Sequence, residues 1–300
     1  MAEITRRRTG ELLRKLFEIL LENPDGLQAS EALKALASSV TLTNYEQGIY
    51  ESSGTRRFDK IVRFATVDCV KAGWLLKHKG IWSVTGAGEQ AYQSWLDPEA
   101  FYKEACRLYA QWKSSQPGTS DTSTSVSSDE VDGDDKSASI TFEQAEEQAW
   151  AEIEHYLGAM NPYEFQDLVA DLLKAMGYFV SWVSPPGKDG GVDIIAHTDP
   201  LGTSTPRIKV QVKRQIQKTD RSGLASFSAV VNDDEVGIFV STGGFTKDAE
   251  EFARSQARRR VTLIDFERLV DLWIQFYGKL DDLARKRLPL TPIYFLTPQA

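Results

Sequence analysis

The sequence predicts a two-domain protein whose larger part is α/β, with a mixed central sheet flanked by helices. Three observations lead to this fold class. A segment poor in large apolar residues divides the 300-residue chain, helical periodicity and a short hairpin precede that segment, and strands and helices alternate after it. The composition is 41% hydrophobic and 26% charged, which is ordinary for a folded chain of two domains.

The first domain is expected over residues 1–113. GELLRKLFEILLEN and LQASEALKALASS place apolar residues at helical spacing, and a third helix begins near Gly54 and runs through TRRFDKIVRFATVDCVKAGWL. WLLKHKGIWSV then alternates around Lys79-Gly80 as a two-stranded hairpin, and Thr85 is the expected cap of a further helix. Three helices followed by a hairpin predict an N-terminal winged-helix domain, a variant of the helix-turn-helix.

The third helix of a winged helix usually enters the major groove of DNA. Its exposed positions are expected to include Arg56, Arg57, Lys60 and Arg63, a basic face suited to phosphate and base contacts. Two alternatives stay open for these residues. They can form a solvated helix face balanced by acidic neighbours, or the winged helix can contact protein instead of DNA.

Residues 114–139 are expected to form a disordered acidic linker. The segment is rich in Ser, Thr, Asp and Gly and has almost no large apolar residue, so it cannot bury enough surface to offset its chain entropy. It also contributes strongly to the net charge of −8. One hypothesis is that its acidic residues compete with DNA for basic surfaces when the protein is idle.

The second domain is expected over residues 140–300. A helix in the Glu143–Leu157 region leads to Asn161-Pro162, a cap followed by proline at the first helical position, and YEFQDLVADLLKAM continues to Gly177. YFVSWV, VDIIAH and RIKVQVKRQ then predict three strands joined by turns. Helix, strand, helix, strand and helix follow in GLASFSAVVND, VGIFVST, KDAEEFARSQARRR, VTLID and FERLVDLWIQFYG. This order predicts a mixed sheet with a cleft at its strand ends.

The candidate site lies in the second and third of these strands. Asp193 follows two glycines, which let the backbone turn tightly and leave room for a ligand beside the carboxylate. Gln211 and Lys213 share one face of the next strand because strand side chains alternate. Asp193, the Gln211 amide oxygen and the Val212 carbonyl suit Mg²⁺, while Lys213 faces the attacking water or the phosphate. Spacing of this kind occurs by chance in many sheets, and a polar Gln or Lys on a strand is more often just on the solvent-facing side.

From Met160 to about Trp273 the chain resembles the catalytic domain of the Mrr family of restriction endonucleases, within the PD-(D/E)xK nuclease superfamily. The resemblance rests on NPYEFQDLVADLLKAMGY, GKDGGVDII, KVQVKR, VGIFVSTGGFTKDAEEFA and VTLIDFERLVDL, in family order. The segment RFDKIVRFATVDCVKAGWLLKHKGIWSVTGAGE is similar to that family's N-terminal domain. The resemblance therefore implies a restriction-endonuclease-like fold for the second domain.

The resemblance also implies a Mg²⁺-dependent endonuclease, for which Mn²⁺ can substitute. Its implied substrate is modified DNA, such as methylated DNA, and its implied role is type IV restriction of foreign DNA. Asp193 matches the family's metal-binding acid, and Lys213 matches its catalytic lysine. Gln211 stands where the wider superfamily has Glu or Asp, although glutamine is usual in the Mrr branch. Glu164 matches a helix acid that completes the metal site, but an exposed acid favoured by the helix dipole explains it equally well.

Further expectations concern partners and location. Lys188 and Arg214 are expected to add DNA contacts, because the stretch around them is locally basic. Double-strand cleavage needs two centres or two successive nicks, so a homodimer or larger assembly is expected. The absence of a long apolar run or signal peptide predicts a cytoplasmic protein without membrane association. The alternative functions are a DNA-binding regulator and a ligand-gated defence effector that uses the nuclease-like domain.

Overall fold

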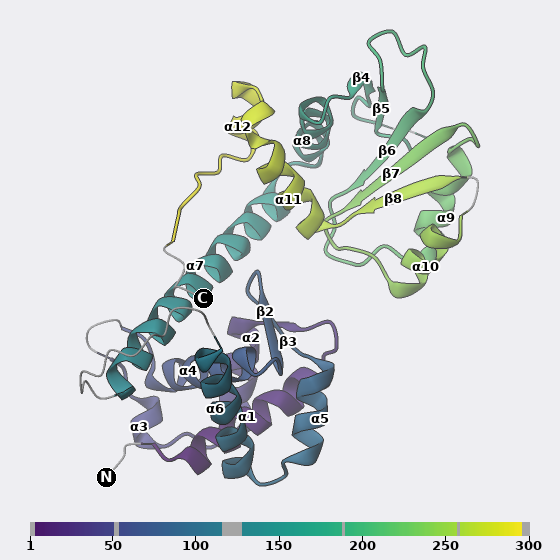
Figure 1. Cartoon of the computed structure of the whole chain (residues 1–300). Helices are drawn as coiled ribbons and strands as arrows, with labels where there is room; N and C mark the ends of the chain where they lie inside the picture. Colours follow the sequence, from purple (N-terminus) through teal and green to yellow (C-terminus); the bar gives the residue numbers. More distant parts are fainter. Residues whose placement is uncertain (1–3, 51–53, 116–127, 188–189, 257–258, 296–300) are drawn as a thin grey trace. The chain divides into compact units, whose positions relative to one another are not determined.

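The computed structural model describes residues 4–50, 54–115, 128–187, 190–256 and 259–295 (Figure 1). The chain divides into two compact units. The N-terminal unit comprises Met1–Glu152 and Tyr294–Ala300, and the C-terminal unit comprises Ile153–Ile293. Within the described ranges, no helix is long and apolar enough to cross a membrane.

The N-terminal unit has the expected winged-helix elements. Its helices pack around a core that includes Leu16, Phe17, Phe58 and Trp82, all fully buried. A small antiparallel sheet has the strand order β1-β3-β2. In chain order the elements are α1 (Arg6–Leu21), β1 (Leu27–Gln28), α2 (Ala29–Ser39), α3 (Asn44–Gln47), α4 (Arg57–Lys71), β2 (Leu75–His78), β3 (Ile81–Val84), α5 (Gly86–Ser94) and α6 (Pro98–Ser114).

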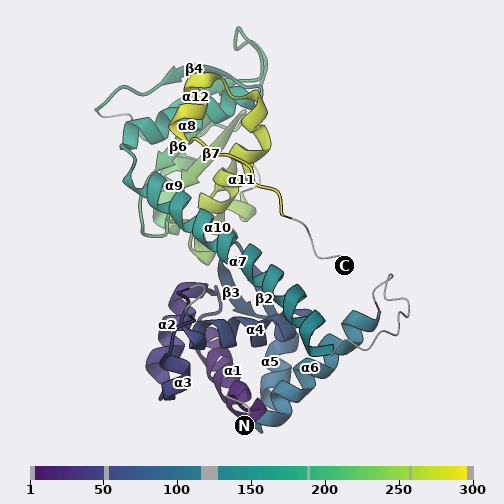
Figure 2. The same ribbon diagram turned by 90° about the vertical axis from the view of Figure 1, so that its left-hand side faces the viewer.

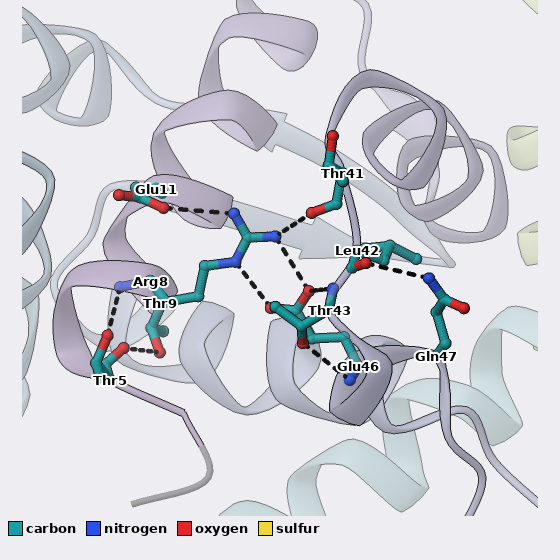
Figure 3. A network of polar contacts seen from close by, with 9 residues as sticks. All are labelled: Thr5, Arg8, Thr9, Glu11, Thr41, Leu42, Thr43, Glu46 and Gln47. Atoms are coloured by element: carbon teal, nitrogen blue, oxygen red, sulfur yellow. Dashed lines mark hydrogen bonds and ion pairs between the residues drawn. The ribbon is translucent and has the colours of Figure 1, made fainter.

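An ion pair between the half-buried Arg8 and the buried Glu46 joins α1 to α3 (Figure 3). Arg8 Nε and Nη2 donate to the two oxygens of Glu46 at 2.8 and 3.0 Å, and Nη2 also donates to the Thr41 carbonyl at 2.7 Å. Glu46 closes a capping box with Thr43 at the start of α3. Burial alone would raise the pKa of Glu46, but the hydrogen bonds from Arg8 and from the Thr43 backbone outweigh it and hold that pKa below its ordinary value.

The expected linker differs from the structure in its second half. Helix α7 runs over Ser128–Ala159, so residues 128–139 are helical, whereas residues 116–127 lie outside the described residues. The division between the units falls inside this helix, after Glu152, and not at residues 113 and 140. Once a helix is nucleated, each further residue adds a backbone hydrogen bond at little cost, so a polar composition does not end it.

The C-terminal unit contains a five-stranded sheet in the order β4-β5-β6-β7-β8. The β4-β5 and β5-β6 pairs are antiparallel, and the β6-β7 and β7-β8 pairs are parallel, which confirms the mixed sheet. In chain order the elements are α8 (Pro162–Ala175), β4 (Phe179–Val183), β5 (Ile194–His197), β6 (Arg207–Lys213), α9 (Arg221–Val230), β7 (Glu235–Ser241), α10 (Lys247–Ser255), β8 (Arg260–Ile264), α11 (Phe266–Phe276), a short 3₁₀ turn (Tyr277–Lys279) and α12 (Asp282–Arg287).

Helices cover both faces of this sheet. On one face, α9 and α10 pack through Leu224, Phe227 and Ala249 against Phe239 of β7. On the other face, α8 and α11 border an apolar cavity of about 280 Å³ whose floor includes Ile238 of β7. Because side chains alternate along a strand, Gln211 and Lys213 of β6 lie on the α9 face.

Candidate active site

Asp193 is fixed between β5 and β6 at the expected place. Its backbone N–H donates to the Val210 carbonyl at 2.8 Å, and its Oδ2 accepts a hydrogen bond from the Val212 N–H at 2.6 Å. The residue is only 7% exposed. The carboxylate therefore lies against the residue that separates Gln211 from Lys213 along β6.

Two features of the α9 face place Gln211 and Lys213. A Cβ built on Gly191, whose φ is +85°, would lie 3.8 Å from Gln211 Nε2, so this glycine faces the glutamine side chain. Lys213 Nζ lies 5.5 Å from the centre of the Phe239 ring and 3.7 Å from the position of a Cβ on Gly223, in the first turn of α9. The lysine ammonium is thus held near the start of α9.

The described contacts do not attach Glu164 to this group. Glu164 is exposed in the first turn of α8, as an acid stabilised by the helix dipole would be. Gln166, which the sequence analysis missed, is 7% exposed, and its Nε2 donates to the carbonyls of Ser184 at 2.9 Å and Asp193 at 3.4 Å. Gln166 lies one helical turn before the buried Val169, and this helical spacing could have indicated that its side chain is buried too.

The end of β6 is supported by the segment that follows β7. Thr242 N–H donates to the Lys213 carbonyl at 3.1 Å, and the Thr242 hydroxyl exchanges hydrogen bonds with the backbone of Gln215 at 2.8 and 2.9 Å. The buried Ser241 accepts a hydrogen bond from Thr219 at 3.1 Å. These side chains fix the backbone on which Lys213 is carried.

The donor atoms at this site suit a hard divalent cation. Within the described residues there is no group of three or more His, Cys, Asp or Glu side chains able to hold a metal ion. The expected set is instead one carboxylate from Asp193, one amide oxygen from Gln211 and the carbonyl of Val212. Mg²⁺ takes few protein oxygens and completes its shell with waters and substrate phosphate, so this set fits its chemistry.

Three of the predicted DNA-binding residues lie together at the start of α4. Arg56 pairs with Asp59 at 2.8 Å. Arg57 and Lys60 both lie over the ring of Tyr50, at 5.6 and 4.8 Å from its centre. All three are partly exposed, so a basic surface is available at this end of the helix.

The expectation that Arg63 is exposed is wrong. The residue is 5% exposed, and its guanidinium nitrogens pair with Glu143 at 2.6 Å and Glu147 at 2.7 Å. Both acids belong to α7, which covers this turn of α4. Periodicity within α4 cannot reveal a covering segment that lies eighty residues further along the chain.

The two remaining predicted contacts lie in the C-terminal unit. Lys188 falls outside the described residues. Arg214 is half-buried, and its Nη1 donates to the Gly158 carbonyl at the end of α7. Its guanidinium therefore already has a backbone partner within the unit.

Comparisons with known proteins place both units in one family. Residues 157–273 match the Mrr-type restriction endonuclease catalytic domain, and residues 10–94 match the Mrr N-terminal domain. Over 123 residues, the chain is 33% identical to the type IV methyl-directed restriction enzyme EcoKMrr of Escherichia coli (strain K12), covering 39% of each protein. Among solved structures, the MspJI restriction endonuclease in complex with a 27-mer oligonucleotide aligns with 69% of this chain and 47% of that one, at 20% identity and a TM-score of 0.32. With a matching domain in each unit, the chain belongs to the Mrr family of restriction endonucleases.

Proposed function

We propose that this protein is a Mg²⁺-dependent DNA endonuclease in which the N-terminal unit binds duplex DNA and the C-terminal unit hydrolyses its phosphodiester bonds. The observation that carries the proposal is the hydrogen bond of 2.6 Å between Asp193 and the Val212 N–H. It sets a buried carboxylate beside Gln211 and Lys213, the residues expected of a metal-dependent nuclease. The match of residues 157–273 to a restriction endonuclease domain supports the same activity.

Asp193, Gln211 and the Val212 carbonyl would hold the cation, which would supply positive charge for the phosphate and lower the pKa of a bound water. Lys213 donates to a non-bridging phosphate oxygen and stabilises the negative charge that develops there during displacement. Burial of Asp193 and the hydrogen bond from Val212 keep the carboxylate in place. Gln166 positions the backbone of Asp193 from the opposite side.

The proposed substrate is modified double-stranded DNA, such as methylated DNA, in defence against foreign DNA in the cytoplasm. The similarity to a relative described as methyl-directed supports this substrate class. Cleavage of both strands requires two catalytic centres or successive nicks, so we propose that a homodimer or larger homo-oligomer is the working form. Glu164 is retained in the proposal as a metal ligand acting through water.

The test compares wild type with Asp193→Asn and Lys213→Ala on methylated and unmethylated plasmid, with Mg²⁺ and with chelator. Lys247→Ala is the matched control, because it removes one exposed lysine from the first turn of α10. We expect wild type and the control to cut methylated plasmid only with metal, and both site variants to lose cleavage while still binding DNA. Cleavage by Asp193→Asn at the wild-type rate would refute the site. DNA binding without any cleavage by wild type would favour a DNA-binding regulator.

A further inference from the structure

Part of α7 covers the surface formed by α4 and the β2-β3 hairpin. We name residues 140–150 of α7 the covering segment; Figure 2 shows α7 running beside β2, β3 and α4. Glu143 accepts hydrogen bonds from Arg63 and Lys77, both at 2.6 Å, and from the indole N–H of Trp82 at 3.1 Å. Glu147 accepts a second one from Arg63 at 2.7 Å. Both carboxylates therefore point at cations of α4 and of the β2-β3 hairpin.

The charges in this contact are nearly all removed from water. The side chains of Arg63 and Lys77 are 6% and 10% exposed, and those of Glu143 and Glu147 are 11% and 13% exposed. Burial lowers the pKa of Lys77 to about 8 even with Glu143 beside it. Buried ion pairs gain little over hydrophobic packing, because desolvation of the ions offsets their attraction. A contribution to folding stability alone is therefore a poor explanation for the acidic residues that bind at this position.

Few residues give the covering segment apolar support. Ile140 packs with Val67 and Tyr109, the ring of Phe142 meets that of Phe295 at 5.4 Å, and Lys79 lies 4.4 Å from the centre of the Trp150 ring. Glu143 and Glu147, one helical turn apart, make the central contacts. A segment held mainly by charge can be displaced by another anion that offers the same contacts, and the DNA backbone is such an anion.

We propose that the covering segment is an intramolecular competitor of DNA, in which Glu143 and Glu147 occupy the positions that phosphates take on the N-terminal unit. Release of the segment frees Arg63 and Lys77 to join Arg56, Arg57 and Lys60 on the DNA. The inference rests on the proposed function, since it requires that this unit binds duplex DNA. It places the competing acids at 143 and 147, and not in the stretch before residue 139.

The first test uses the full chain with Glu143→Gln and Glu147→Gln combined. DNA affinity is measured by fluorescence anisotropy on one duplex over a range of salt concentrations. We expect the variant to bind about tenfold more tightly at low salt, and its slope of log K against log salt to be steeper by about 2, because two more cations reach phosphates. The control combines Glu152→Gln with Glu154→Gln, which removes the same charge from exposed positions of the same helix.

The second test uses the unmodified protein and so does not depend on the folding of a variant. Carbodiimide labelling of Glu143 and Glu147, read by mass spectrometry, should rise about severalfold when duplex DNA is added, because the two carboxylates leave their buried contacts. Unchanged labelling on saturating DNA would overturn the inference, as would equal affinity and salt slope in both double variants. If no form of the protein binds DNA, the proposed function fails together with the inference.

Discussion

At the scale of single residues, Gln166 supports Asp193 through the backbone. Its amide group donates to two carbonyls in a buried position. Gln166→Ala removes one donor from each carbonyl, although the Asp193 carbonyl still accepts from the Ser184 N–H at 2.8 Å. Each lost hydrogen bond costs about 0.5–1.5 kcal/mol. We expect a lower free energy of unfolding in urea and a cleavage rate that falls more than DNA affinity does. Gln275→Ala, at an exposed position of α11, is the control. If Gln166→Ala cleaves DNA at the wild-type rate, Gln166 does not position Asp193 for catalysis.

The ion pair between Arg8 and Glu46 makes stability depend on pH. Because the pKa of Glu46 is held below its ordinary value of 4.5, the pair contributes stability that is present above pH 4.5 and is lost as pH falls through the lower folded value. Glu46→Gln should therefore be less stable than wild type at pH 7, by about 1–3 kcal/mol. The difference should shrink as the solution is acidified below pH 4.5.

Urea unfolding between pH 3 and pH 8 checks this expectation. Glu18→Gln breaks the partly exposed pair with Lys15 and should change stability by less than about 1 kcal/mol throughout. A constant gap between wild type and Glu46→Gln at every pH would show that the carboxylate charge contributes nothing to the fold.

At the scale of elements, the turn after β7 packs closely against the segment that follows β6, the strand that carries Gln211 and Lys213. A Cβ on Gly243 would lie 2.3 Å from the carbonyl oxygen of Gln217 and 2.7 Å from that of Ile216. Gly243→Ala must move this backbone, so we expect a lower melting temperature and slower cleavage. Gly158→Ala in α7 has open space around the added methyl group and should be neutral or stabilising by up to about 1 kcal/mol. Equal melting temperatures for the two variants would contradict this reading of the turn.

The sequence predicted those elements whose evidence is local. The Lys79-Gly80 hairpin turn has positive φ at both residues, and Thr85 and Asn161 cap the helices expected of them. The family resemblance pointed to Asp193 and to the strand of Gln211 and Lys213, and the structure places Asp193 against Val212 of that strand; their catalytic roles stay predictions. The burial of Arg63 could not be predicted, because the acids that cover it come from α7. Gln166 was missed for a related reason, since its partners lie on β-strand ends distant in sequence.

At the scale of the whole molecule, composition misplaced the division between the units. The polar stretch before residue 139 looked like the boundary, yet contacts of Ile140, Glu143 and Glu147 attach the following part of α7 to the N-terminal unit. Low hydrophobicity shows where a chain cannot form its own core, but it does not show where one core ends and another begins.

The course of α7 decides how this protein can be dissected or recombined. A fragment ending at residue 113 loses Ile140 and both glutamates, so Val67 and Arg63 face solvent. A fragment ending after Glu152 keeps these contacts. If N-terminal units were exchanged between relatives at residue 113, our proposal predicts that the transferred unit would bind DNA without competition from the covering segment. Exchange after Glu152 would transfer the unit together with that segment.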